Sequence, residues 1–144
     1  MNLNEALFSL IHTVRNTMIQ QLKSLDMNLS PMHLKSLKAV SKIEQCTGQK
    51  LADFMGRDKA QVNRLIKELV NQELLIKKDN EKDKRSQLLI LAASGEALIE
   101  EFNKVENEVF SAMASELEPD QIESFIQITQ TFKSNLDAAY RKKN

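Results

Sequence analysis

Apolar residues recur at three- and four-residue steps through the first 25 positions of the chain, beginning with Leu3 and Leu7. This spacing places them on one face of a helix of about six turns. The same periodicity predicts a long helix after Gly95 that runs to about Glu116, and a last helix that begins at Pro119. Both ends of the chain are therefore predicted to be long amphipathic helices.

A short break precedes the second predicted helix. Ser30 is a favoured N-cap residue, and Pro31 suits the first helical position because the N–H that it lacks is not needed there. Leu34 and Val40 belong to an apolar stripe with helical spacing. We expect this helix to end at residues 46–48.

A short helix, a tight turn and another helix are predicted between residues 49 and 69. The short helix covers residues 49–54 and ends near Gly56, and Asp58 then follows as an N-cap. Gln61 lies three residues further on and completes an Asp-x-x-Gln form of the capping box. The apolar residues of this helix face inward, which leaves an outer, mostly polar face. That face consists of Ala60, Gln61, Asn63, Arg64 and Lys67.

Two short apolar strands follow, at residues 74–78 and 86–91, with a charged loop of residues 79–85 between them. The loop is too charged to pack into a core, so the segment is predicted to form a β-hairpin with an exposed tip. A helix-turn-helix followed by a basic hairpin can place one helix in a DNA groove and a wing over the next groove. The order of elements therefore predicts a protein whose partner is double-stranded DNA.

Charge is unevenly distributed along a chain whose formal net charge is zero. Residues 57–88 carry nine Lys or Arg and six Asp or Glu, whereas residues 89–128 carry nine acidic residues and one Lys. Such asymmetry makes one face attractive to phosphate while another stays acidic. The basic segment coincides with the predicted helix-turn-helix and hairpin. A content of three Gly and two Pro favours a mostly helical protein.

Several side chains on the outer face of the predicted helix 59–69 suit contacts with DNA. The amides of Gln61 and Asn63 can pair with adenine edges, and Arg64 can reach guanine or a phosphate. Lys59 lies at the helix start, where backbone N–H groups and the helix dipole favour a phosphate. An ordinary solvated helix face is the alternative interpretation, and the neighbouring turn and hairpin favour DNA. The predicted DNA-contacting set on this helix is Lys59, Ala60, Gln61, Asn63, Arg64 and Lys67.

Asp83 and Arg85 lie two residues apart in the charged loop, and on an extended segment their side chains would emerge on the same side. A carboxylate there can hold a guanidinium in one orientation, and an oriented Arg suits a narrow minor groove. Lys82 and Lys84 would add contacts with phosphates. A solvated hairpin tip is the alternative interpretation, because many Lys-rich turns look similar.

A set of short motifs spans residues 51–96. It consists of Leu51-Ala52, Asp58-Lys59, Val62, Arg64-Leu65, the Asp-x-Arg pair Asp83 and Arg85, and Leu91 with Gly95. In these motifs the segment resembles the MarR family of bacterial winged-helix regulators. The resemblance extends across the chain, because Ser30-Pro31 matches the opening of that family's second helix and long helices flank the motifs.

The resemblance implies a mainly α fold with a small β-wing. A winged helix-turn-helix lobe would cover residues 30–92 of a single domain spanning residues 1–144, and residues 1–26 and 94–142 would form dimerisation helices. The implied function is a transcriptional regulator, acting as a repressor on a palindromic operator and relieved by a small aromatic ligand. His12, on the first helix, is the candidate ligand contact.

The chain departs from the family pattern at two positions. Glu73 stands where family members usually have Gly, so we expect Asn71 to take the positive φ that the turn requires. Ala92 stands where Thr is usual, so we expect Ser94 to replace it as a helix cap. Both changes affect local stability more than DNA binding.

The first and last helices have wider apolar faces than a small central lobe can cover. Long helices of this kind usually bury such faces against each other or against a second subunit. Because most soluble oligomers have twofold symmetry, we expect a homodimer held by residues 3–25 and 95–141. The predicted interface residues are Leu3, Leu7, Leu10, Phe125, Phe132 and Leu136.

Cys46 is the only cysteine, which excludes an internal disulfide and suits a reducing compartment. Lys42 and Lys50 lie four residues to either side and could lower the pKa of the thiol, so a cysteine-based redox-responsive regulator is one alternative. A partly buried, inert thiol is the simpler interpretation.

No other chemistry-bearing set emerges from the sequence. It lacks a Gly-rich phosphate loop, a Ser beside a His base and clustered metal ligands, so we expect no enzyme activity, cofactor or metal. No apolar run approaches the ~20 residues of a membrane span, and the start lacks a basic secretory signal. We therefore expect a cytoplasmic protein without a membrane partner. A winged helix used only as a protein-interaction module is the other alternative, and steeply salt-dependent DNA binding would exclude it.

Overall fold

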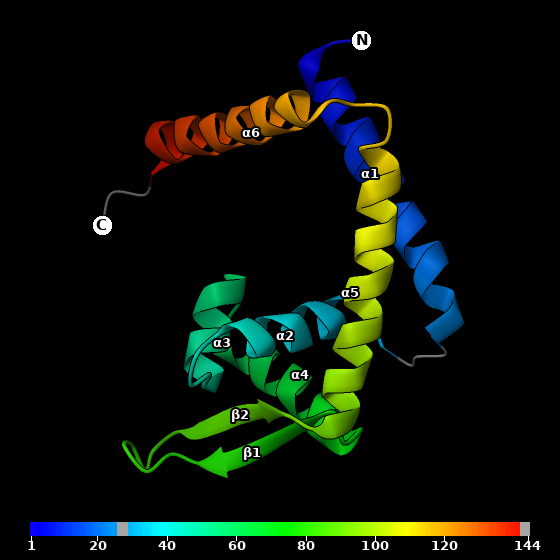
Figure 1. Cartoon of the computed structure of the whole chain (residues 1–144). Helices are drawn as coiled ribbons and strands as arrows, with labels where there is room; N and C mark the ends of the chain where they lie inside the picture. The colour runs from blue at the N-terminus through cyan, green and yellow to red at the C-terminus, as the bar shows by residue number, and fades with distance from the viewer. Residues whose placement is uncertain (26–28, 142–144) are drawn as a thin grey trace. The chain divides into compact units, whose positions relative to one another are not determined.

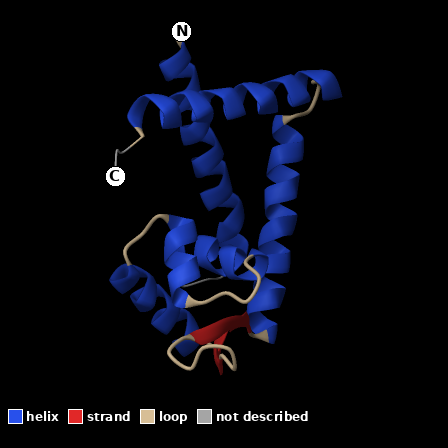
Figure 2. Ribbon diagram, turned by 90° about the vertical axis from the view of Figure 1, so that its left-hand side faces the viewer, coloured by secondary structure: helices blue, strands red, loops and turns tan. Residues whose placement is uncertain are grey.

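The computed structural model describes residues 1–25 and 29–141, in two compact units of residues 1–106 and 107–144. Helix dominates these described ranges, and the strands are confined to one antiparallel ribbon (Figures 1 and 2). This confirms the predicted mainly α fold with a small β-wing. The elements are α1 (Leu3–Leu22), a short 3₁₀ helix η1 (Lys23–Leu25), α2 (Pro31–Lys42), α3 (Gly48–Met55), α4 (Lys59–Asn71), β1 (Leu75–Asp79), β2 (Gln87–Leu91), α5 (Ala93–Met113) and α6 (Pro119–Tyr140).

The start of α2 is as predicted, but its end is not. Ser30 is the N-cap, its Oγ accepts the His33 N–H, and Pro31 occupies the first turn. The helix ends at Lys42, several residues before the predicted end. Thr47 instead caps the next helix, because its Oγ1 accepts the Lys50 N–H at 3.2 Å. Residues 46–48 therefore open α3 rather than close α2.

The hydrophobic core of the first unit lies where α2, α3, α4 and the ribbon meet. Leu37, Leu51, Val62, Leu69 and Leu75 are its fully buried large apolar side chains. They come from the apolar stripes of three helices and from one face of the ribbon, as the spacing predicts. This core holds the polar outer face of α4 and the ribbon in fixed positions.

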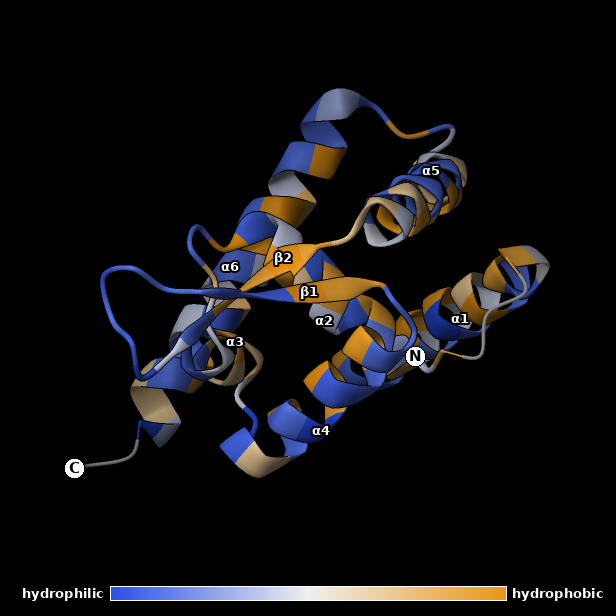
Figure 3. Cartoon of the chain, turned by 90° about the horizontal axis from the view of Figure 1, so that it is seen from below, coloured by the Kyte–Doolittle hydropathy of each residue, from blue (hydrophilic) through white to orange (hydrophobic). Residues whose placement is uncertain are grey.

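The ribbon is a hairpin with regular antiparallel register, in which Leu75 pairs with Leu91 and Lys77 with Leu89. Leu75 and Leu89 are buried, whereas Ile76 and its cross-strand partner Ile90 are exposed. The base of the ribbon is also tied to the start of α3, since the Leu89 N–H donates to the Cys46 carbonyl at 2.8 Å. The free end of the hairpin is the hydrophilic loop that extends from the strands in Figure 3.

The turn between α4 and β1 corrects two expectations. Glu73 itself adopts the positive φ, at 62°, and Asn71 remains the last residue of α4. The Ser94 hydroxyl donates to the Glu73 carbonyl at 2.6 Å instead of capping α5. A side chain 21 positions later thus fixes the turn that lacks the usual glycine.

The second unit contains α6, whose start is fixed by Gln121, because its Oε1 accepts the Glu118 N–H at 2.9 Å. No residue of α6 is buried within this chain, and the large side chains of Phe125 and Leu136 are 46% and 59% exposed. In the first unit α1 is similar, since it also contains no buried residue. Residues 26 and 142, at the edges of the predicted dimerisation segments, lie outside the described part of the chain.

Candidate nucleic-acid interface

The turn between α3 and α4 is closed by a residue in the left-handed conformation. Gly56 has a φ of 62°, which favours glycine because a side chain is strained there. The Gly56 N–H donates to the Asp53 carbonyl and the Arg57 N–H to the Ala52 carbonyl. These bonds satisfy the last carbonyls of α3 and allow α4 to begin at Lys59, three residues after the turn.

The outer face of α4 is the first part of the candidate site. Asp58 caps the helix, since its Oδ1 accepts the Gln61 N–H at 3.0 Å, which is one of the two bonds of the predicted capping box. Val62, Ile66 and Leu69 are buried, so the opposite face is fixed toward solvent. The predicted DNA-contacting residues of α4 are all exposed: Lys59, Ala60, Gln61, Asn63, Arg64 and Lys67.

The wing tip is the second part, and its geometry differs from the prediction. Asp83 Oδ1 accepts the backbone N–H of Arg85 at 3.0 Å, and the Ser86 N–H donates to the Asp83 carbonyl. The segment is therefore a series of turns and not an extended stretch. Asp83 orders the backbone that carries Arg85, rather than holding the guanidinium through an ion pair. Lys82, Asp83, Lys84 and Arg85 are all exposed at this tip.

A hollow of about 220 Å³ brings the two parts together. Lys59 and Asn63 line it from α4, and Arg85 lines it from the end of the wing loop. Lys77 on β1 also lines this hollow, although the sequence reasoning did not single it out. Strand alternation could have found it, because Lys77 lies on the same face of β1 as the buried Leu75. Three cations from three elements thus surround one concavity, a favourable surface for phosphates.

A second hollow of about 220 Å³ lies on another flank of α4. Arg57, Gln61 and Arg64 line it together with Glu68 and Met32. Arg57 was also missed by the sequence reasoning, although its place just after the turn glycine puts it beside the N-terminus of α4. Basic side chains therefore border α4, the predicted recognition helix, on more than one flank.

The remaining candidate residues lie in different surroundings. Cys46 is 2% exposed, and burial raises the pKa of its thiol, with only partial opposition from the Lys50 charge. This favours the inert thiol over a reactive thiolate. His12 is exposed on α1, where its Nε2 accepts from the Asn16 amide at 3.0 Å.

The described part of the chain contains neither a cluster of metal-ligating side chains nor a membrane-spanning helix. No three His, Cys, Asp or Glu side chains gather there in an arrangement able to hold a metal ion. None of its helices is both long and apolar enough to span a membrane.

The sequence and the fold were compared with those of known proteins. Residues 27–86 match the sequence profile of the MarR family. No sequence among curated proteins is significantly similar to the chain. Among solved structures, S. aureus MepR in complex with DNA is 22% identical, with a TM-score of 0.79 over 94% of this chain and 100% of that one.

Two further solved structures share the fold at similar distance. E. coli MarR in its apo form is 17% identical, with a TM-score of 0.72 over 92% of this chain and 97% of that one. Bordetella bronchiseptica BpsR is 19% identical, with a TM-score of 0.74 over 92% of this chain and 93% of that one. The profile match covers the helix-turn-helix, β1 and the wing loop but ends before β2, and the fold agrees along nearly the whole chain. Residues 27–86 are thus similar to the MarR family, and nearly the whole chain has the winged-helix fold of these solved structures.

Proposed function

We propose that the protein is a DNA-binding transcriptional repressor that binds a palindromic operator as a homodimer. The observation that carries this proposal is the hollow between α4 and the wing, where Lys59, Asn63, Lys77 and Arg85 converge. A helix face with amides and cations beside a cationic hairpin matches the requirements of groove and backbone contacts. The structure of MepR in complex with DNA supports the same role.

Within this proposal, α4 enters the major groove. Gln61 and Asn63 read base edges, Arg64 contacts guanine or a phosphate, and Lys59 holds a phosphate at the helix start. Ala60 and Lys67 lie on the same exposed face and complete the contact surface.

The wing contacts the flanking groove. Arg85 enters the minor groove, and Lys82 and Lys84 contact phosphates on either side of it. The order that Asp83 gives to the tip through its bond to the Arg85 N–H lowers the entropy lost on binding. Reading of base edges in the major groove is thus assigned to α4, and minor-groove and phosphate contacts are assigned to the wing.

The homodimer is proposed because apolar surface on α1 and α6 is uncovered within one chain. Two copies would bury these faces against each other and place two lobes on successive turns of DNA. The proposed interface includes Leu3, Leu7, Leu10, Phe125, Phe132 and Leu136.

We further infer that a small aromatic molecule weakens DNA binding. The DNA binding of BpsR is regulated by 6-hydroxynicotinic acid, which supports an effector of this chemical class. Such a ligand must bind more tightly to a dimer in which the spacing of the two DNA-binding lobes does not fit DNA. His12 is the candidate contact. Thermal shifts against a panel of phenols and aromatic acids, repeated with operator DNA, test this: an effector must both stabilise the protein and lower DNA affinity.

Fluorescence anisotropy on palindromic DNA tests the central proposal. Half-sites about 10–11 bp apart should bind best, with affinity that falls steeply as salt rises. Asn63→Ala should cost about 1–3 kcal/mol on the preferred site and relax preference at one base pair. Asn103→Ala is the matched control, because Asn103 is exposed on α5, away from the predicted DNA contacts. A protein that binds no DNA even at low salt would contradict the proposal and favour a protein-interaction module.

A further inference from the structure

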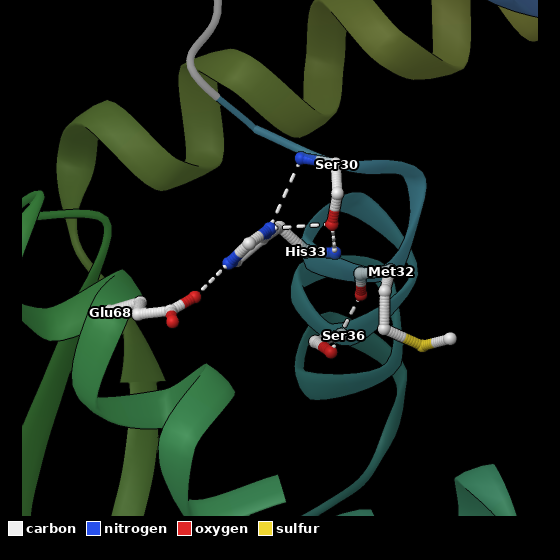
Figure 4. A network of polar contacts seen from close by, with 5 residues as sticks. All are labelled: Ser30, Met32, His33, Ser36 and Glu68. Atoms are coloured by element: carbon white, nitrogen blue, oxygen red, sulfur yellow. Dashed lines mark hydrogen bonds and ion pairs between the residues drawn. The ribbon is translucent and has the colours of Figure 1, made fainter. Parts of the chain in front are cut away.

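His33 joins the start of α2 to the recognition helix. Its ring lies between Ser30 at the beginning of α2 and Glu68 on α4 (Figure 4). Nδ1 is 2.7 Å from Ser30 Oγ and 3.1 Å from the Ser30 backbone nitrogen, while Nε2 contacts the Glu68 carboxylate. The His33 side chain is only 14% exposed, so water competes weakly for these bonds.

The hydrogen-bond partners determine which ring nitrogen carries the proton. A backbone N–H can only donate, so the bond from Ser30 requires Nδ1 to be an acceptor. Ser30 Oγ accepts the His33 N–H, which leaves its own hydrogen to donate to Nδ1 as well. The proton of the neutral ring therefore lies on Nε2 and is donated to Glu68.

Glu68 has a competing cation on its own helix. Arg64 lies four residues earlier, a spacing at which Arg and Glu side chains meet on a helix surface. Arg64 and Glu68 also line the same hollow, with Arg57 close by. Within the described part of the chain Arg64 takes part in no ion pair, and the Glu68 carboxylate is turned to His33 instead.

We propose that His33 is a positioning residue for DNA recognition: by holding Glu68, it keeps Arg64 unpaired and available to DNA. This rests on the proposed function and adds to it a residue that does not touch DNA. When His33 no longer holds the carboxylate, Glu68 pairs with Arg64 and partly neutralises a cation of the recognition helix. His33 and Glu68 lie 35 residues apart in the sequence, so their contact depends on the tertiary structure.

Four proteins test the proposal: wild type, His33→Gln, Glu68→Gln and the double variant. Gln is chosen at position 33 because Ser-x-x-Gln is itself a capping box, so the start of α2 stays ordered while the imidazole is removed. Because a Gln amide can also donate to a carboxylate, the comparison is repeated with Ala at position 33, which has no side-chain donor. Gln is chosen at position 68 because it keeps the size and the acceptor of Glu but removes the charge that would pair with Arg64. Operator affinity is measured by anisotropy at low salt, and thermal unfolding at one protein concentration reports folding.

The expected pattern is a non-additive one. His33→Gln should weaken operator binding by about three- to tenfold, since an Arg contact is lost to an intrahelical pair. Glu68→Gln alone should change affinity by less than about twofold, because Arg64 is already unpaired in the wild type. The double variant should recover most of the operator affinity that His33→Gln loses, and it should be no less stable than His33→Gln.

Two outcomes overturn the inference while the proposed function stands. If Glu68→Gln tightens binding equally with and without His33, Glu68 acts only through its charge. If the double variant binds as weakly as His33→Gln, the effect of His33 does not pass through Glu68. A wild type that binds no DNA overturns the proposed function itself, and the positioning role with it.

A measurement without DNA checks the geometry independently. The nitrogen-15 spectrum of the His33 ring in the free protein should show the neutral tautomer with its proton on Nε2, and Glu68→Ala should move the Nε2 resonance. A proton found on Nδ1 at neutral pH contradicts the hydrogen-bond assignment and overturns the inference.

Discussion

Gly95 shows how a single residue allows two elements to touch. It lies in the first turn of α5, and a Cβ built on it would be 2.2 Å from the carbonyl oxygen of Leu74. That same oxygen accepts the Ala92 N–H at 3.0 Å, so the backbone there cannot retreat without losing a bond. The helix therefore begins against the start of the ribbon only because this position has no side chain.

Gly95→Ala should destabilise the protein by about 1–3 kcal/mol, because the clash outweighs the better helix propensity of Ala. Gly48→Ala is the matched control, since a Cβ there meets its neighbours at 3.5 Å and 3.6 Å, an ordinary contact. The control should leave the Tm unchanged or raise it slightly. Thermal melts at one protein concentration compare the two, and equal Tm values would show that the α5 start can shift at no cost.

Some residue roles could be predicted from local patterns and others could not. Ser30 and Asp58 are caps where their spacing predicts them, because a cap and its partner lie within one turn. The roles of Ser94 and His33 were missed, because their partners lie 21 and 35 residues away. Local spacing contains no information about such pairs until the fold brings them together.

The wing tip is the element whose order matters most for DNA binding. Its loop has no apolar side chain to anchor it, and hydrogen bonds within the loop order it instead. The bond from the Arg85 N–H to Asp83 Oδ1 is one of them, and the bond from the Lys82 N–H to Asn80 Oδ1 is another. A free loop would lose conformational entropy on meeting DNA, and this loss would reduce affinity.

Asp83→Ala should weaken operator binding, even though it removes a negative charge from a surface that meets phosphates. Asp83→Asn is the matched control, because its amide oxygen can still accept the Arg85 N–H while the charge is gone. The turn-ordering account therefore predicts that Asn binds at least as well as wild type and Ala binds less well. Anisotropy at two salt concentrations separates the accounts: tighter binding by both variants would mean that the wing acts only through its net charge.

At the level of elements the sequence predicts the order and type of the α-helices and strands in the described part of the chain, with the largest error at the end of α2. The 3₁₀ helix η1 was not predicted as a separate element. Apolar periodicity identifies which segments are helices, and the alternation around the loop identifies the hairpin. Residues 46–48 were assigned to the wrong helix, because Thr and Gly can end one helix or begin the next. The contact of Cys46 with β2 decides between these options, and it is a tertiary contact.

At the scale of the whole molecule, large apolar side chains are exposed on α1 and on α6. Side chains such as Phe8 and Leu136 are 69% and 59% exposed in one chain, which is unusual for large apolar residues on amphipathic helices. Because these side chains do not belong to the core of one chain, replacing them tests the proposed dimer without disturbing the fold of that chain.

Leu136→Glu should convert the protein from dimer to monomer in sedimentation at micromolar concentration, because a charge would be buried without a partner. Gln130→Glu, which adds the same charge at a polar exposed position of α6, should remain dimeric. Leu7→Glu should act like Leu136→Glu if both helices belong to one interface. A wild type that sediments as a monomer, or a Leu136→Glu variant that stays dimeric, would refute the proposed interface.

The buried thiol has a practical consequence. Cys46 is the single cysteine of the chain, and burial both shields its sulfur and keeps it protonated, so thiol-reactive dyes should leave the folded protein unmodified. A cysteine introduced at an exposed wing position, as in Lys84→Cys, would then accept a dye selectively without removal of the native one. In a dimer the two dyes would report the spacing of the wings by energy transfer, in solution and as DNA or an effector is added.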